Sequence, residues 1–93
     1  SDLNQTQPNP KNEINKKFSY DIKIADFYFN DTALLLINRI NNETVIKSAK
    51  IKKITEKKYR VYLGPFANIN ALQKSFNDIN ILEFENIEII KND

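Results

Sequence analysis

The sequence predicts an α+β domain whose elements follow the order β-α-β-β-α-β. Three observations lead to this prediction: short stretches in which apolar and polar residues alternate, two stretches with helical spacing of apolar residues, and an internal repeat that relates the two halves of the chain. A chain of 93 residues is long enough for one domain with a compact core.

The first 17 residues differ in composition from the rest. Residues 1–17 contain two of the three prolines, many Asn and Gln residues, and only Leu3 and Ile14 as large apolar residues. Such a segment cannot bury enough surface to offset the entropy lost on ordering. We interpret residues 1–17 as a flexible linker and residues 18–93 as the domain; an extension with no role of its own is the alternative. Since the chain does not begin with Met, we expect it to be a piece of a longer protein.

The first half of the domain predicts one strand and one helix. Apolar residues alternate with polar ones from Phe18 to Ile24, which indicates a half-buried strand. Residues 26–31 are predicted to form a loop, with Asn30 or Asp31 as the helix N-cap. The helix that follows has an apolar face made of Ala33, Leu36, Ile37 and Ile40, and we expect it to end at residues 41–42.

The rest of the domain predicts three more strands and a second helix. A strand is expected within residues 44–54, with Ala49 and Ile51 facing inward, and a turn at residues 55–58. The next strand, residues 59–63, is predicted to stop at Gly64-Pro65-Phe66. Asn68 or Asn70 is expected to cap the second helix, and residues 84–90 to form the last strand. The apolar face of this helix is made of Leu72, Phe76 and Ile79 together with Ser75.

The two halves are related by a shift of 39 residues. This shift places Tyr20 on Tyr59 and Phe27 on Phe66, and it superimposes both strands and both helical faces. Two βαβ halves with right-handed crossovers form a four-stranded antiparallel sheet of order 4-1-3-2 with both helices on one face, the ferredoxin-like or RNP-like architecture. Phe27 and Phe66 are expected to close the core where the helices begin, and Tyr20 and Tyr59 to face inward.

The other face of this sheet is then open to solvent. Alternation places Lys23, Arg60 and Tyr62 on this face of the two middle strands. A tyrosine ring and the planar donor fork of an arginine suit sugars or other ring-shaped ligands. An ordinary solvated sheet face is the alternative. The same alternation adds Asp21, Lys50, Lys52, Ile54, Glu88 and Ile90 to the face.

The composition argues against several classes of function. There is no Cys and no His, so thiolate nucleophiles, zinc–thiolate sites and the commonest general base are missing. One Gly excludes a Gly-rich phosphate loop, and 14 basic against 12 acidic residues is too even for an electrostatic nucleic-acid binder. Asp26 and Glu88 are the only pair of carboxylates worth weighing as acid and base, and no nucleophile supports them. We therefore expect a non-catalytic binding domain with no metal and no cofactor.

One segment carries a family resemblance. Residues 59–66 read Tyr-Arg-Val-Tyr-Leu-Gly-Pro-Phe, which resembles the hallmark segment of SPOR domains. Residues 22–27 resemble the first, weaker copy of that motif, 39 residues upstream, and the resemblance extends over residues 18–90. Ala25 stands where the first motif of the family has Gly, Lys23 where it often has Gln, and Asp26 where it often has Ser.

The resemblance implies binding of peptidoglycan. SPOR domains are periplasmic modules that recognise glycan strands without stem peptides, which accumulate at the division septum, and Arg60 matches a family residue implicated in glycan contact. Lys52 and Arg60 are expected to pair with the lactyl carboxylates of the glycan. The candidate glycan-binding residues, from the resemblance and the alternation together, are Lys23, Asp26, Lys52, Ile54, Arg60, Tyr62 and Ile90.

The resemblance also implies a setting for the domain. We expect it to be the monomeric C-terminal module of a cell-wall protein, without membrane insertion by this segment. The motif is most similar to that of septal lytic transglycosylases anchored by lipid to the outer membrane; membrane-anchored division proteins and amidase-linked proteins are the other options. A protein-interaction or dimerisation domain is the main alternative function. A single-stranded RNA-binding domain is less favoured, because Tyr62 is the only outward aromatic on the middle strands.

Overall fold

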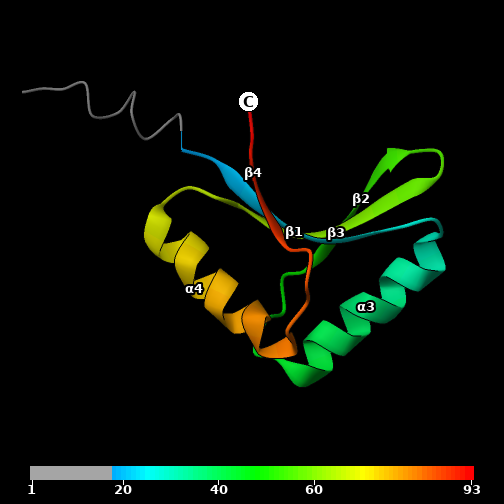
Figure 1. The fold of residues 1–93 in the computed structure, drawn as a ribbon, viewed down its shortest axis with the longest axis horizontal. Coiled ribbons are helices and arrows are strands. Elements are labelled where there is room, and N and C mark those ends of the chain that lie inside the picture. The colour runs from blue at the N-terminus through cyan, green and yellow to red at the C-terminus, as the bar shows by residue number, and fades with distance from the viewer. Residues whose placement is uncertain (1–17) are drawn as a thin grey trace, which may run out of the picture.

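A computed structural model describes residues 18–93, and the linker predicted for residues 1–17 lies outside the described residues. Four strands form one antiparallel sheet of order β2-β3-β1-β4, the order predicted from the sequence. Both helices lie on the same side of this sheet and converge where α3 ends (Figure 1). The elements are β1 (Tyr20–Phe27), α3 (Asn30–Glu43), β2 (Lys50–Thr55), β3 (Lys58–Phe66), α4 (Ile69–Ile79), the 3-10 helix η1 (Asn80–Leu82) and β4 (Glu88–Lys91).

The core lies between the sheet and the two helices. The two middle strands supply the inward residues that alternation predicts, and each helix buries one face against them. Phe27, Phe66, Tyr20 and Tyr59 are half-buried and pack against this core, as expected from their positions in the repeat. The buried residues are Ile22, Ile24, Ala33, Leu36, Ile40, Ile46, Val61, Leu63, Leu72 and Ile79.

The predicted ends of the two middle strands are wrong. β1 continues through Asp26 and Phe27, which were predicted to lie in a loop, and β3 continues through Gly64-Pro65 to Phe66. Each extension lies beyond a shift in the register between β1 and β3. In β3, Gly64 and Pro65 together lie opposite Asp21, so the strand bulges there and then pairs again at Phe66.

Gly64 is required at this bulge by its backbone angle and by the approach of β1. Its φ of +123° is one that residues with a side chain rarely adopt. A Cβ at this position would lie 2.7 Å from Oδ1 of Asp21 and 3.0 Å from the carbonyl oxygen of Tyr20. The glycine therefore allows close contact between the middle strands, and it does not end the strand as predicted.

The predicted helix starts are half right. Asn68 caps α4, and its side-chain oxygen accepts a 2.8 Å hydrogen bond from the Ala71 backbone N–H. α3, in contrast, has Phe29 at its N-cap and no side-chain cap, so the prediction of Asn30 or Asp31 is wrong. Both residues lie in the first turn instead, where the Asp31 carboxylate faces the positive end of the helix dipole.

The predicted ends of α3 and of the last strand also need correction. α3 extends to Glu43 and ends at Thr44, whose hydroxyl donates a 2.8 Å hydrogen bond to the Ile40 carbonyl oxygen. β4 begins only at Glu88, because the irregular segment after η1 occupies residues 84–87, which alternation assigned to the strand. Across the described residues, no helix combines the length and the apolar composition needed to cross a membrane.

Candidate functional site

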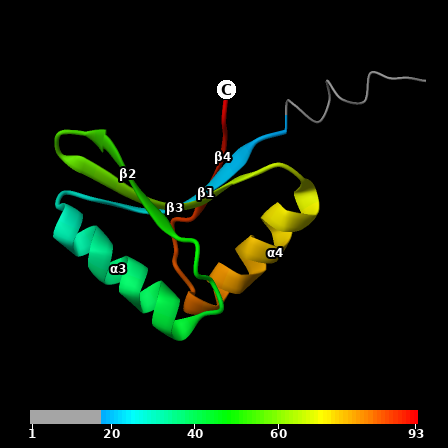
Figure 2. The same cartoon turned by 180° about the vertical axis from the view of Figure 1, so that it is seen from behind.

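The sheet face turned away from the helices, here called the open face, carries a row of charged residues and one tyrosine. Figure 2 shows the molecule from behind, with both helices again on one side of the sheet. In the strand register, Lys23 lies opposite Tyr62 and Asp26 opposite Arg60 on the middle strands. β2 adds Lys50 opposite Tyr62 and Lys52 opposite Arg60. β4 adds Glu88 opposite Lys23.

A β-bulge in β1 brings Asp26 onto this face. Lys23 and Asp26 are three residues apart, so regular alternation would place them on opposite faces. Between Lys23 and Ala25, β1 advances by two residues while β3 advances by one, and the extra residue is the buried Ile24. The bulge reverses the alternation, so that Asp26 turns to the open face beside Arg60.

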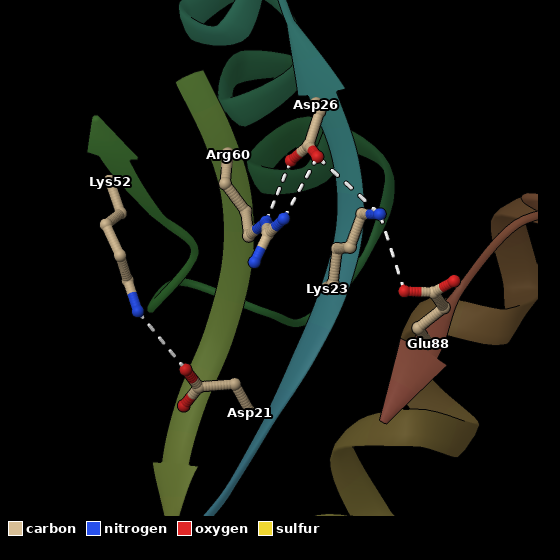
Figure 3. A network of polar contacts seen from close by, with 6 residues as sticks. All are labelled: Asp21, Lys23, Asp26, Lys52, Arg60 and Glu88. Atoms are coloured by element: carbon tan, nitrogen blue, oxygen red, sulfur yellow. Dashed lines mark hydrogen bonds and ion pairs between the residues drawn. The ribbon is translucent and has the colours of Figure 1, made fainter. Parts of the chain in front are cut away.

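Arg60 and Asp26 form a two-pronged ion pair at the centre of the open face. Nε of Arg60 donates to Oδ1 of Asp26 at 2.8 Å and a terminal nitrogen donates to Oδ2 at 3.1 Å (Figure 3). Each side chain is only 20% exposed. The hydrogen bonds from Arg60 lower the pKa of the Asp26 carboxyl, against the opposing effect of desolvation, and the same bonds raise the pKa of Arg60. Arg60 is therefore held by its neighbour and is not a loose outward side chain.

Lys23 connects this pair to the edge strand. Its ammonium nitrogen lies 3.5 Å from Oδ2 of Asp26 and 3.4 Å from Oε1 of Glu88, as Figure 3 shows. Asp26 and Glu88 thus share one cation, and Lys23 adds to the effect of Arg60 in lowering the pKa of Asp26. A lowered pKa does not suit Asp26 to the role of a general acid, which requires a carboxyl that stays protonated. Among the described residues, no group of three or more acidic side chains could hold a metal ion.

Asp21 lies near the start of β1, at the other end of the strand from Asp26. Its side chain is 8% exposed, although alternation predicts a solvent-facing residue. Oδ2 lies 3.4 Å from Nζ of Lys52, and Oδ1 accepts a 3.1 Å hydrogen bond from the Asn92 side chain. The bulge at Gly64 and the C-terminal segment that contains Asn92 cover Asp21, so alternation alone could not reveal its burial.

Tyr62 presents the only aromatic ring of the middle strands on the open face. The ammonium of Lys52 lies 4.5 Å from the centre of its ring, within cation–π range, while also reaching Asp21. Lys50 flanks the ring and donates a 2.8 Å hydrogen bond to the Gly64 carbonyl oxygen. We call Tyr62 with Lys52 the Tyr62 subsite; it combines a flat apolar ring with a half-exposed positive charge.

A groove of about 410 Å³ adjoins the charged row. It lies between the second half of β1 and the segment that leads into β4, because β4 pairs with β1 only as far as Lys23. Its lining is half polar in character and includes the Phe84 ring. The lining residues are Lys23, Ile24, Ala25, Asp26, Phe84, Glu85, Asn86 and Glu88.

The structure brings together most of the candidate residues but not all of them. Lys23, Asp26, Lys52, Arg60 and Tyr62 lie on adjacent strands in one network. Ile54 lies apart, at a register shift next to the β2–β3 turn, and is 37% exposed. Ile90 is half-buried opposite Asp21 at the edge of the sheet.

Sequence reasoning placed Glu88 on the open face but missed its link to Lys23, and it missed the roles of Asp21 and Asn92. Alternation offers a signal for Glu88, because Glu88 faces the same side of the sheet as Lys23, its partner on β1. No comparable signal exists for Asn92, whose contact with Asp21 joins residues 71 positions apart.

The fold and the open face together define the class of the domain. It is an α+β domain with helices on one side of a four-stranded antiparallel sheet and a polar, tyrosine-bearing surface on the other. Comparisons of the chain with protein-family models, with curated proteins and with solved structures find no match. The residues of the open face, together with the resemblance of residues 59–66 to SPOR domains, are therefore the basis for inferring a function.

Proposed function

We propose that this domain is a non-catalytic peptidoglycan-binding module that recognises glycan strands lacking stem peptides. Its parent protein would be directed in this way to the division septum in the bacterial periplasm. The motif at residues 59–66 supports a parent of the rare lipoprotein A type, a septal lytic transglycosylase. The motif lies on β3, in the middle of a sheet whose open face is free of helices, and this position supports peptidoglycan binding.

The observation that carries the proposal is the Tyr62 subsite. A pyranose ring has one apolar face, which stacks on an aromatic ring, and a rim of hydroxyl and amide groups that seek polar partners. Tyr62 supplies the ring, and Lys52 supplies a cation 4.5 Å from it. The Arg60–Asp26 ion pair and Lys23 offer donors and acceptors nearby. Because these side chains already contact one another, ligand binding costs little side-chain entropy.

The same subsite accounts for selectivity toward stripped strands. In intact peptidoglycan the lactyl carboxyl of each muramic residue is tied up in an amide bond to the stem peptide. Removal of the peptide leaves a carboxylate, with which the ammonium of Lys52 can form a charge-assisted contact. Arg60 is less suited to this role than the sequence suggests, because Asp26 occupies its donor fork at 2.8 and 3.1 Å and its side chain is 20% exposed. Lys52 also has an acidic partner, Asp21, but at 3.4 Å, and its side chain is 44% exposed.

Co-sedimentation with purified sacculi tests the proposal. The domain should pellet with amidase-treated sacculi and stay in solution with intact, peptide-rich ones. Tyr62→Ala and Lys52→Gln should each reduce the pelleted fraction several-fold. Lys74→Gln is the matched control, since Lys74 is an exposed lysine on α4, in the helix layer. Equal binding to treated and intact sacculi, or full binding by both variants, would contradict the proposal.

A second candidate function is self-association, favoured by an apolar groove on the helix side of the edge strand. The groove has a volume of about 360 Å³ and lies where α4 meets β4. Ile89, on the unpaired edge of the sheet, is 45% exposed there. A molar mass by light scattering that doubles with concentration, and returns to the monomer in Ile89→Lys, would support this function over a monomeric glycan binder.

A further inference from the structure

A second tyrosine–lysine pair lies beyond the end of β1. Tyr28 directly follows Phe27, is 54% exposed, and has the ammonium of Lys57 at 5.9 Å from its ring centre. Lys57 belongs to the turn between β2 and β3, and Figures 1 and 2 both show this turn beside the loop that joins β1 to α3. The Tyr62 subsite has the same composition, a tyrosine ring with a lysine ammonium over it, although the Tyr62 side chain is half-buried.

Continued alternation beyond the last registered pair would place Tyr28 on the same side of the sheet as Tyr62. The last registered pair of the middle strands is Phe27 with Tyr59, and both residues pack against the core. Tyr28 follows Phe27 directly, just outside β1. In continued alternation it would face the opposite way from Phe27, as Lys58 does from Tyr59, on the side of Tyr62. We therefore extend the open face past the end of β1 to Tyr28.

The Tyr28 ring contacts the ring of Phe29. The two rings meet edge to face, with centres 4.9 Å apart and planes at 76°. Phe29 is 63% exposed, so this aromatic pair contributes little to the core. Contiguous exposed apolar patches mark binding surfaces, and Tyr28 and Phe29 place two exposed aromatic rings side by side. We call Tyr28, Phe29 and Lys57 the Tyr28 subsite.

The spacing of the two subsites fits one extended ligand. Along β3, Tyr62 and Lys58 are four residues apart, which corresponds to about 13 Å of strand. The Arg60–Asp26 pair lies between them, with its polar atoms partly exposed. A single sugar cannot reach both rings, whereas a glycan strand of several sugars can cross the middle strands from one ring to the other.

We infer that the domain has two sugar-stacking subsites, at Tyr62 and at Tyr28, and that one anionic glycan strand occupies both along β1 and β3. This inference rests on the proposed function and deepens it. The ligand class is a repeating glycan with a carboxylate in each repeat, so that Lys52 meets one carboxylate and Lys57 meets another. Because the second contact is made within an already bound ligand, affinity should rise steeply once the glycan is long enough to reach both rings.

Titration calorimetry with stripped glycan oligosaccharides of one, two, three and four disaccharide repeats tests this inference. The wild-type domain should gain at least about tenfold in affinity across the series, since linking two weak contacts makes the second one intramolecular. Tyr28→Ala should bind the single repeat as the wild type does and lose most of the gain with length. Tyr28→Phe should retain the gain, because it keeps the ring. Leu35→Ala is the matched control, since Leu35 is an apolar side chain on α3 that is also more than half exposed.

The outcomes separate the two proposals. A Tyr28→Ala variant with the full length-dependent gain would overturn the second subsite and leave glycan binding at Tyr62 intact. Absence of binding by the wild type at every length would overturn the proposed function and the second subsite with it. Thermal melts of all variants should agree within about 3 °C, because exposed side chains contribute little to stability.

Discussion

Arg60→Ala is the substitution that best tests whether Arg60 is held in an ion pair, as in the structure, or is a freely moving surface side chain. An outward side chain on a solvated face would leave stability nearly unchanged when truncated. In the structure, Arg60 makes two hydrogen bonds to Asp26, and each side chain is four-fifths buried. Its loss leaves the Asp26 carboxylate partly desolvated with only Lys23 nearby.

The expected cost lies between those of surface and buried ion pairs. Exposed pairs contribute roughly 0–1 kcal/mol, whereas removing one partner of a fully buried pair costs about 3–5 kcal/mol. For a pair that is 20% exposed with two good hydrogen bonds, we expect Arg60→Ala to lower the free energy of unfolding by about 2 kcal/mol. In a domain of this size that loss corresponds to a melting temperature lower by about 8–16 °C.

The pH dependence follows from the lowered pKa of Asp26. A carboxyl whose pKa is lower in the folded chain stabilises the fold fully above its unfolded value, and this contribution is lost as pH falls through the folded pKa. The unfolded value of an aspartate is about 3.9. The gap between wild type and Arg60→Ala should therefore be widest near neutral pH and should shrink at acid pH, as Asp26 becomes protonated in both proteins.

Urea denaturation followed by circular dichroism at pH 7 and near pH 2 measures these quantities. Lys74→Ala is the control, since it removes an exposed ion pair with Asp78 and should cost about 0.3–0.5 kcal/mol. A double-mutant cycle of Arg60→Ala with Asp26→Ala isolates the pair itself. An Arg60→Ala variant as stable as the wild type at pH 7, or a coupling energy near zero, would refute the reasoning.

Three further predictions concern the fold. Gly64→Ala should lower stability by at least about 2 kcal/mol in a chemical melt, because its φ is positive and a Cβ would clash with Asp21; an unchanged midpoint would contradict this. Asn68→Ala should cost about 1 kcal/mol through loss of the α4 cap, while Asn70→Ala should cost less than half of that; equal losses would argue against the cap. Ile40→Ala should cost about 2–5 kcal/mol in the same assay, because Ile40 is fully buried in the core, and a loss below 1 kcal/mol would contradict that placement.

The fold was predictable because both halves of the chain carry the same local signals. Alternation on the middle strands identified Ile22 and Val61 as inward residues, and both are fully buried. Helical spacing likewise identified Ile40 and Ile79. The repeat then required one sheet order, because two right-handed βαβ crossovers leave few others.

The ends of the elements and the details of the site were less predictable. Whether Asp26 lies in a loop or on the open face depends on the bulge at Ile24, which arises from pairing with a strand more than thirty residues away. Alternation correctly placed Arg60 on the open face, but it could not show that Asp26 would occupy its guanidinium. The burial of Asp21 depends in the same way on Asn92, near the opposite end of the domain. Local patterns therefore predict which face a residue takes, and only the strand register determines which partner it finds there.

Nuclear magnetic resonance mapping of a stripped glycan oligosaccharide on the isotope-labelled chain tests the central claim most directly. The account predicts that amide shifts will change along β1 and β3, strongest around Tyr62 and Arg60 and extending to Tyr28. The exposed surfaces of α3 and α4 should remain unchanged. Shifts confined to the helix layer, or no shifts at millimolar glycan, would contradict the claim that the open face binds glycan.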